Sequence, residues 1–453
     1  MSETLSAIVS AGAKTRAQPA LFIGLAADAP RAAGARLSLA DIDRVDLGRG
    51  ETRAFTRRTA DGARLLVAVL VDARMSTQHA RITRLGTRWF VEDLASKNGT
   101  LVRGARVARH ELRDGDAICV GHTMLVFREA GGEGGDLQAA PAGEAPGLST
   151  WSPALAARFA ELATAARTNV PIEIMGPSGT GKELVARAVH ALSSRRGKLA
   201  AINCGALPAN LLEGELFGHK KGAFTGAGDE RAGLIRSADQ GTLFLDEVAE
   251  LPASSQAALL RVLQEGEVMP LGSDAAIKVD VRLVTATHKN LDAEVAANRF
   301  RADLRARMLG VQVVLPELRE RREDLGMLVA TLLERLAPDR TVTFSSDAAT
   351  ALYTYDWPLN IRELERALAA ALAIATDRVE LHHLPAAVRQ QDARPPATTI
   401  PEDLTADELA LRESLSAAIA RHDGNLAAVA RELGKDRTQI RRWMKRFGLA
   451  RED

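Results

Sequence analysis

The sequence contains only two cysteines, Cys119 and Cys204, among its 453 residues. Because they are few and far apart, they cannot supply a disulfide framework or a Cys-based zinc site within this chain, and a reducing compartment fits best. The formal net charge is only +1, so any nucleic-acid binding must rest on locally concentrated basic charge. Residues 1–20 lack a continuous apolar segment, and no later stretch stays apolar long enough to span a bilayer. We therefore expect a cytoplasmic protein.

The length predicts two to four domains. Stretches rich in Gly, Ala and Pro, without helical or strand periodicity, predict two linkers. The N-terminal part has short apolar runs separated by Gly and Asp, which predicts a β-sandwich; the central part alternates strands and helices, which predicts an α/β domain with a parallel sheet; the C-terminal part is all-α. The predicted boundaries are 18–130 for the first domain, 131–147 for a flexible linker, 148–390 for the central domain with a helical lid from about 318, 391–401 for a second linker, and 402–453 for the last domain.

A glycine-rich segment that ends in Lys182 follows an apolar strand at Ile172 to Met175 and opens a helix. This context predicts a phosphate-binding loop, in which backbone N–H groups and the lysine contact the phosphates of ATP. A glycine-rich turn without a ligand is the alternative. The predicted nucleotide-binding residues of this loop are Gly176, Pro177, Ser178, Gly179, Thr180, Gly181, Lys182 and Glu183, where Glu183 replaces the usual Ser or Thr ligand of Mg²⁺.

Two carboxylates end the apolar strand Leu243 to Leu245. At the carboxyl edge of a parallel sheet, Asp246 is predicted to hold Mg²⁺ and Glu247 to orient and deprotonate the attacking water. Thr287, which ends a later strand, is predicted to sense the γ-phosphate. A structural acidic pair at a helix N-terminus is the alternative for Asp246 and Glu247.

Residues 215–227 read Glu-Leu-Phe-Gly-His-Lys-Lys-Gly-Ala-Phe-Thr-Gly-Ala. This segment resembles the signature of sigma-54-dependent transcription activators within the AAA+ ATPase superfamily, and the resemblance extends over about residues 148–390. It implies a mobile loop that contacts the sigma factor of RNA polymerase. The loop consists of Gly222, Ala223, Phe224, Thr225, Gly226 and Ala227.

The same resemblance implies roles for four further residues. Arg301 and Arg307 match arginine fingers, which act on the nucleotide of a neighbouring subunit, so hydrolysis should require a hexameric or heptameric ring. Arg305, between them, is interpreted as a solvated helix charge. Asn203 matches the residue that holds the catalytic Glu away from water, or else satisfies loop backbone. Arg362 matches a second sensor that reaches the nucleotide from the lid, although Leu359 stands where the family has Gly.

The C-terminal segment Asn425 to Phe447 predicts two short helices around a glycine turn, which is a helix-turn-helix. It resembles the Fis-type domain that ends many such activators, and this implies binding to double-stranded enhancer DNA. A solvated basic helix is the alternative. The second helix carries the predicted DNA contacts Arg437, Thr438, Gln439, Arg441, Arg442 and Lys445.

The N-terminal domain resembles a forkhead-associated (FHA) domain, a β-sandwich whose loops bind phosphothreonine. The resemblance lies in Gly48-Arg49-Gly50, in the segment from Ser76 to Ile82, and in the segment from Asp93 to Thr100. It implies that Arg49, Ser76 and Ser96 bind the phosphate, that Asn98 holds the peptide backbone, and that His79 supports the loops. The stretch between Arg49 and Ser76 is longer than in the family, so either a loop is inserted or Arg49 is misplaced, and a domain kept only for packing stays an alternative.

Together these features predict a three-part sigma-54-dependent activator: a phosphothreonine input, an ATP-driven ring with Mg²⁺ that remodels the sigma-54 RNA polymerase, and a DNA anchor. The sequence has no phospho-acceptor receiver domain, so control by an Asp phosphorelay on this chain is not expected. Two other classes remain open. One is an AAA+ protein remodeller outside transcription, and the other is a DNA-binding repressor without ATPase activity.

Overall fold

The computed structural model describes residues 18–32, 34–132, 135–139, 143–222, 229–390, 411, 414–415, 418–419, 421–422 and 426–446. It divides into two compact units. The first unit holds the N-terminal domain, residues 325–355 and residues from 368 onward; the second holds residues 140–324 and 356–367. Among the described residues, no helix is both long and apolar enough to cross a membrane.

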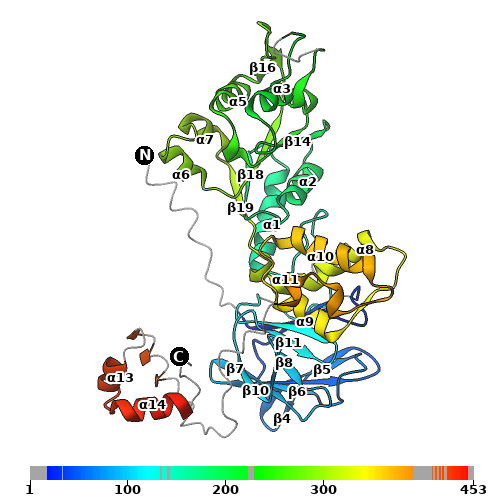
Figure 1. Cartoon of the computed structure of the whole chain (residues 1–453), viewed down its shortest axis with the longest axis vertical. Coiled ribbons are helices and arrows are strands. Elements are labelled where there is room, and N and C mark those ends of the chain that lie inside the picture. Colours follow the sequence, from blue (N-terminus) through cyan, green and yellow to red (C-terminus); the bar gives the residue numbers. More distant parts are fainter. Residues whose placement is uncertain are drawn as a thin grey trace. The chain divides into compact units, whose positions relative to one another are not determined.

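The N-terminal domain is a sandwich of two six-stranded sheets, as the short apolar runs predicted (Figure 1). One sheet has the order β2-β1-β12-β11-β8-β9 and the other the order β10-β7-β6-β3-β5-β4. The strands are β1 (Ala20–Ala26), β2 (Ala35–Ser38), β3 (Arg44–Arg49), β4 (Ala54–Ala60), β5 (Ala63–Leu70), β6 (Ala80–Leu85), β7 (Arg88–Asp93), β8 (Thr100–Val102), β9 (Ala105–Val107), β10 (Arg109–Leu112), β11 (Ala117–Val120) and β12 (Thr123–Arg128).

Alternate residues of both sheets form the core of this sandwich, because successive side chains of a strand point to opposite faces. Leu21 and Ile23 of β1 and Ile118 of β11 meet Val45 of β3 and Ile82 of β6 in one buried apolar cluster. The predicted flexible linker differs from this structure in its described part. Leu137 pairs with Arg36 of β2, and the carboxylate of Asp136 forms an ion pair with Arg57.

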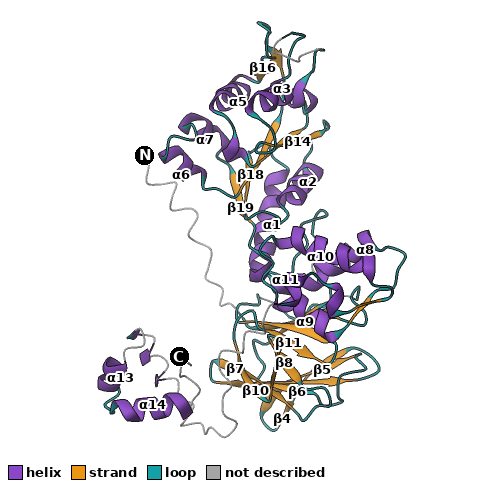
Figure 2. Ribbon diagram, viewed as in Figure 1, coloured by secondary structure: helices purple, strands orange, loops and turns teal. Residues whose placement is uncertain are grey.

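The second unit is built on a five-stranded parallel sheet of order β14-β15-β18-β13-β19, which confirms the predicted α/β class (Figure 2). Its elements are α1 (Pro153–Ala166), β13 (Ile172–Met175), α2 (Lys182–Leu192), β14 (Leu199–Asn203), α3 (Ala209–Phe217), α4 (Gly233–Ser237), β15 (Thr242–Asp246), α5 (Ala253–Glu265), β16 (Glu267–Val268), β17 (Ile277–Lys278), β18 (Arg282–Thr287), α6 (Leu291–Ala296), α7 (Ala302–Met308) and β19 (Val311–Val314).

Helices cover both faces of this sheet, so its strands are apolar on both sides. Phe244 of β15 belongs to the cluster formed with α1 and α2, whereas its neighbours Leu243 and Leu245 belong to the cluster formed with α3 to α7. The run Leu243 to Leu245 therefore lacks alternation because both faces are buried. The carboxyl edge of the sheet is left for polar residues.

A helical region follows, with α8 (Leu325–Leu336), β20 (Thr343–Phe344), α9 (Ser346–Thr354), α10 (Asn360–Ile374), β21 (Arg378–Val379) and α11 (Ala386–Arg389). This is the predicted lid. The described part of the last domain contains α13 (Leu426–Glu432) and α14 (Arg437–Arg446). Gly434 forms the turn between them with a φ of +61°, a backbone angle that favours glycine, and the buried Val429 and Ile440 pack in one apolar cluster. The predicted helix-turn-helix is thus present.

Candidate nucleotide site and phosphopeptide loops

The glycine-rich loop lies between β13 and α2, as predicted. Gly179 has a φ of +78°, and a Cβ atom there would lie 2.2 Å from the carbonyl oxygen of Leu359. Gly181 has a φ of +105° at the start of α2. Only glycine meets both the backbone angle and the close approach at position 179.

Lys182 is buried and its Nζ atom folds back toward the loop. It donates to the carbonyl oxygen of Gly176 at 2.9 Å and lies 3.4 Å from Oε1 of Glu247. The lysine therefore joins the loop to the carboxylates that end β15. This cation stands where the phosphates of a nucleotide would need charge neutralisation.

Asp246 and Glu247 differ in their surroundings. Burial raises the pKa of Asp246, and the adjacent charge of Glu247 raises it further. Burial also acts to raise the pKa of Glu247, but the hydrogen bond from His288 and the charge of Lys182 outweigh it, so the pKa of Glu247 is lowered. Glu247 also adopts a φ of +50°, which is unusual for a residue with a side chain and typical of functional sites.

The side chain that holds Glu247 is His288, whose Nδ1 atom lies 2.7 Å from Oε2 of Glu247. Asn203, which the resemblance assigned to this role, instead donates from Nδ2 to Oδ2 of Asp246 at 3.1 Å and accepts a bond from the backbone N–H of Gly205. The predicted Asn203–Glu247 contact is therefore absent from this structure, and its alternative role, satisfying loop backbone, is present. The sequence shows a histidine directly after Thr287, at the end of β18, but it does not indicate that this histidine contacts Glu247.

A pocket of about 780 Å³ opens at this edge of the sheet. Its lining includes the phosphate-binding loop, both partners of the His288–Glu247 pair, and Asn203. Thr287 is fully buried, and its Oγ1 atom accepts a hydrogen bond from the backbone N–H of Lys289. Glu183 is exposed on α2 and forms an ion pair with Arg187, so its carboxylate is engaged along the helix.

The first turns of α10 contact the phosphate-binding loop. Arg362 donates from Nη1 to Oγ of Ser178 at 3.0 Å, and Asn360 donates to the carbonyl oxygen of the same residue at 3.0 Å. Asn360 is buried, with a φ of +56°. The sequence predicted Arg362 but missed Asn360 and also Arg321, which donates to the carbonyl oxygen of Thr180 at 2.8 Å.

The candidate arginines of α7 fall into two kinds. Arg301 and Arg307 are exposed, and Arg301 forms an ion pair with Asp303. Arg305 is buried and forms ion pairs of 2.8 Å with Glu173 and with Asp292. The interpretation of Arg305 as a solvated charge was wrong, because its guanidinium is buried and neutralises the buried carboxylate of Glu173 on β13.

The loop from Gly222 to Ala227 is described only at Gly222, which is exposed with a φ of +80°. Ala223, Phe224, Thr225, Gly226 and Ala227 lie outside the described residues. In α14, Arg437, Thr438 and Arg442 are exposed and Gln439 is half-buried, whereas the side chains of Arg441 and Lys445 lie outside the described residues.

The phosphopeptide loops of the N-terminal domain come together. The backbone N–H of Arg49 donates to the carbonyl oxygen of Ser76 at 3.0 Å, which places these two residues side by side. The residues between them include the hairpin of β4 and β5, and β4 forms the edge of the second sheet. His79 is buried and connects the loops, because its ring accepts from the N–H of Ser76 and contacts the carbonyl oxygen of Gly99.

The side chains of Ser96 and Asn98 form hydrogen bonds within the loops, whereas Arg49 is exposed. Ser96 is buried, and its hydroxyl donates to Asp93 at 2.6 Å and accepts from the N–H of Gly99 at 2.9 Å. This geometry makes Ser96 a support of the loop and does not fit direct contact with a phosphate. Asn98 donates from Nδ2 to the carbonyl oxygen of Arg74 at 2.6 Å.

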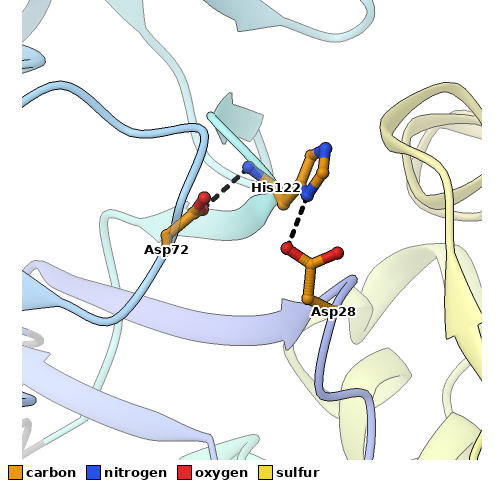
Figure 3. A group of neighbouring side chains, drawn as sticks. All are labelled: Asp28, Asp72 and His122. Carbon is orange, nitrogen blue, oxygen red and sulfur yellow. Dashed lines mark hydrogen bonds and ion pairs between the residues drawn. The ribbon is translucent and has the colours of Figure 1, made fainter.

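Asp28, Asp72 and His122 form a second polar cluster in this domain, with potential ligand atoms within 4.8 Å of one another (Figure 3). Each group already has a structural partner. The carboxylate of Asp72 accepts from the N–H of His122 at 2.7 Å and from that of Arg74 at 2.8 Å, and His122 Nδ1 lies 2.6 Å from Asp28. The cluster fixes two loops to each other, and these bonds account for its geometry without a metal.

Comparison with known proteins gives four family matches along the chain. Models described as FHA domain, Sigma-54 interaction domain, AAA+ ATPase lid domain, and bacterial regulatory protein of the Fis family match residues 57–121, 148–314, 319–400 and 412–447, respectively. The FHA match begins after Arg49, within β4.

Among curated relatives, the transcriptional regulatory protein ZraR of Escherichia coli K12 is 44% identical over 303 residues, which cover 65% of this chain and 67% of ZraR. The hydrogenase transcriptional regulatory protein HoxA of Cupriavidus necator is also 44% identical over 303 residues, but the match spans only 62% of HoxA and 63% of this chain. Among solved structures, NtrX from Brucella abortus in complex with ADP shows 32% identity and a TM-score of 0.49, with 65% of this chain and 68% of that chain covered.

Proposed function

Because the chain belongs to the family of sigma-54-dependent transcription activators, we propose that it hydrolyses ATP as a ring of identical subunits and uses hydrolysis to remodel the closed complex of sigma-54 RNA polymerase. The observation that carries the proposal is the pocket at the carboxyl edge of the sheet, where Lys182, Glu247 and Arg362 converge on one loop. A ring is expected to be hexameric or heptameric.

Within this pocket each side chain has a distinct task. Lys182 and the backbone N–H groups of the loop bind the β- and γ-phosphates, and Arg362 reports the nucleotide to the lid. Glu247, with its lowered pKa, is charged at neutral pH and acts as the base that orients and deprotonates water. His288 holds that carboxylate in the resting arrangement.

Asp246 fits a site for Mg²⁺, because its carboxylate is bonded to the backbone N–H of Glu247, which lines the pocket, and Mg²⁺ prefers oxygen ligands. A bound Mg²⁺ would neutralise negative charge on the phosphates. Glu183 stands where a Ser or Thr usually supplies a hydroxyl ligand for Mg²⁺, so this position offers no hydroxyl. The carboxylate of Glu183 forms an ion pair with Arg187.

Arg301, which precedes the first residue of α7, and Arg307 in α7 are exposed, as fingers that serve a neighbouring subunit must be. The segment from Gly222 to Ala227, with Phe224 and Thr225 at its tip, contacts the sigma factor. Exposed polar and cationic residues of α14 bind enhancer DNA, and the N-terminal domain receives a phosphothreonine signal through Arg49 and Ser76.

The test is transcription from a purified sigma-54 promoter on supercoiled DNA, with sigma-54 holoenzyme and either ATP or a non-hydrolysable analogue. We expect transcripts only with ATP, and none with Lys182→Ala. Phosphate release without transcripts would instead favour an AAA+ remodeller outside transcription. Transcripts with the analogue would contradict the role of hydrolysis.

A further inference from the structure

The sheet that contains β1, β11 and β12 is buried on both faces. In an antiparallel sandwich, the residues that point away from the core normally meet water and alternate with the core residues. Here the outward residues Ala20, Phe22, Cys119, Met124 and Val126 are at most 2% exposed. Something must therefore cover this outer face, which we name the lid face.

The cover is formed by the lid of the same chain. Helix α8 contacts β1, and α9 contacts β11 and β12. Figure 1 shows α9 next to β11. Hydrogen bonds join the two surfaces: the N–H of Phe344 donates to the carbonyl oxygen of Ala27 at 2.8 Å, and Arg31 donates to the carbonyl oxygen of Leu333, near the end of α8, at 3.1 Å. Backbone hydrogen bonding across the contact is typical of the inside of a domain.

Two glycines set how closely the surfaces approach. A Cβ atom on Gly326 of α8 would lie 2.0 Å from the carbonyl oxygen of Gly24 in β1. A Cβ atom on Gly24 would lie 2.2 Å from the hydroxyl oxygen of Tyr353 in α9. Gly326 lies in the first turn of α8, where its missing Cβ allows this close approach, and β1 bulges at Gly24, between Ile23 and Leu25.

The lid face is also connected to the phosphopeptide loops. Asn98 donates to the carbonyl oxygen of Arg74, whose N–H donates to Asp72. The carboxylate of Asp72 accepts from the N–H of His122 at 2.7 Å, next to Gly121 (Figure 3). The carbonyl oxygen of Gly121 accepts from Oγ of Ser346, the first residue of α9, at 3.3 Å. A continuous set of hydrogen bonds thus runs from the ligand loops to the lid.

We propose that the lid face is a permanent docking surface for α8 and α9 of this chain's own ATPase lid, and that the FHA domain controls ATP hydrolysis by setting the position of the lid. The second part rests on the proposed ATPase function. The lid helix α10 connects the two parts of this proposal. It begins at Asn360, which contacts the phosphate-binding loop, so a shift of the lid would reach the nucleotide pocket through α10. The FHA domain therefore needs no direct contact with the nucleotide pocket.

A native cysteine allows the docking to be tested in the full chain. Helix α9 packs on β11, and the side chain of Thr350 on α9 is near enough to the Cys119 thiol on β11 to act on the pKa of that thiol. Thr350→Cys places a second thiol there, and oxidation with copper phenanthroline forms one S–S bond while two Cu²⁺ ions are each reduced to Cu⁺ by one electron and the buffer takes the two protons. Because burial raises the pKa of Cys119 to about 12, the reaction is run at pH 9 for several hours. Cys119→Ser/Thr350→Cys is the control.

We expect the 119–350 disulfide in most molecules, identified by mass spectrometry of unreduced peptides. Its absence overturns the docking. Adding Gly326→Ala to Thr350→Cys should slow disulfide formation at least tenfold, whereas the exposed Thr331→Ala on the same helix should not change it. Equal rates in these two variants also overturn the docking.

The control of hydrolysis is tested with the same pair in an otherwise native sequence. Gly326→Ala should change ATP turnover of the full chain at least threefold, and Thr331→Ala should leave it within experimental error. Slower disulfide formation with unchanged turnover would overturn the control by the lid and leave the docking in place. Failure of the proposed function itself would appear differently, as no hydrolysis by the unaltered chain.

Discussion

His288 Nδ1 lies 2.7 Å from Oε2 of Glu247, the carboxylate that ends β15 and faces the nucleotide pocket. Burial acts to raise the pKa of Glu247, and this hydrogen bond is the largest of the interactions with His288 and Lys182 that lower it. The carboxylate that we propose as the catalytic base is therefore held by the residue that follows the neighbouring strand β18, while Asn203 holds Asp246.

The first prediction concerns this pair. His288→Ala removes a group that lowers the pKa of Glu247, so that pKa should rise and the acidic limb of the hydrolysis profile should move to higher pH. Nucleotide affinity should stay within about twofold, because His288 makes none of the hydrogen bonds of the loop. The measurement is kcat against pH, with fluorescent ADP binding alongside. His288→Asn, which keeps an N–H donor, should stay nearer to the native profile, and an unshifted profile for His288→Ala would disprove the role.

The second prediction separates Arg305 from Arg307. Arg305→Ala leaves the buried carboxylate of Glu173 without its ion pair and should lower the free energy of unfolding by about 3 kcal/mol. Arg307→Ala, on the exposed side of α7, should leave stability within about 0.5 kcal/mol and instead abolish hydrolysis. Urea unfolding and phosphate release measure the two effects. Equal losses of stability would contradict the distinction.

The difference in burial between Arg305 and Arg307 is an example of what the sequence could not predict. Spacing of glycines and strand patterns gave the P-loop, the sheet and Asp246 with Glu247, because local chemistry determines them. The sequence could not tell that Arg305 is buried, since Arg301, Arg305 and Arg307 lie on one short helix and differ only in what surrounds them. The apolar runs of β1 and β12 predicted a sandwich but not the helices that cover its outer face, because α8 and α9 begin only at Leu325 and Ser346, far along the chain.

The third prediction concerns the thiols. Burial raises the pKa of Cys119 and of Cys204 to about 12. At pH 8 only about one thiol in 10,000 is ionised, so both should resist alkylation in the native chain. Iodoacetamide labelling followed by mass spectrometry should show reaction within minutes only in denaturant. Rapid labelling of the folded chain at pH 8 would contradict the burial of these residues.

The fourth prediction distinguishes ligand contact from loop support in the FHA domain. Arg49→Ala should abolish selective binding of phosphothreonine peptides by the full chain without loss of stability, because Arg49 is exposed. Ser96→Ala should cost about 1–3 kcal/mol, since the N–H of Gly99 and the carboxylate of Asp93 lose a buried partner. Peptide-library binding and thermal unfolding measure these effects, and a phospho-selectivity that survives in Arg49→Ala would exclude this residue from the site.

The most direct measurement of the whole account is open-complex formation at a sigma-54 promoter by the full chain carrying Thr225→Ala, with ATP hydrolysis recorded in the same reaction. We expect near-native hydrolysis and no promoter opening, because the proposed role of Thr225 is contact with the sigma factor, and the substitution leaves the pocket around Lys182 and Glu247 untouched. Normal opening by this variant, and by Phe224→Ala as its companion, would contradict the proposal that hydrolysis acts on polymerase through this loop.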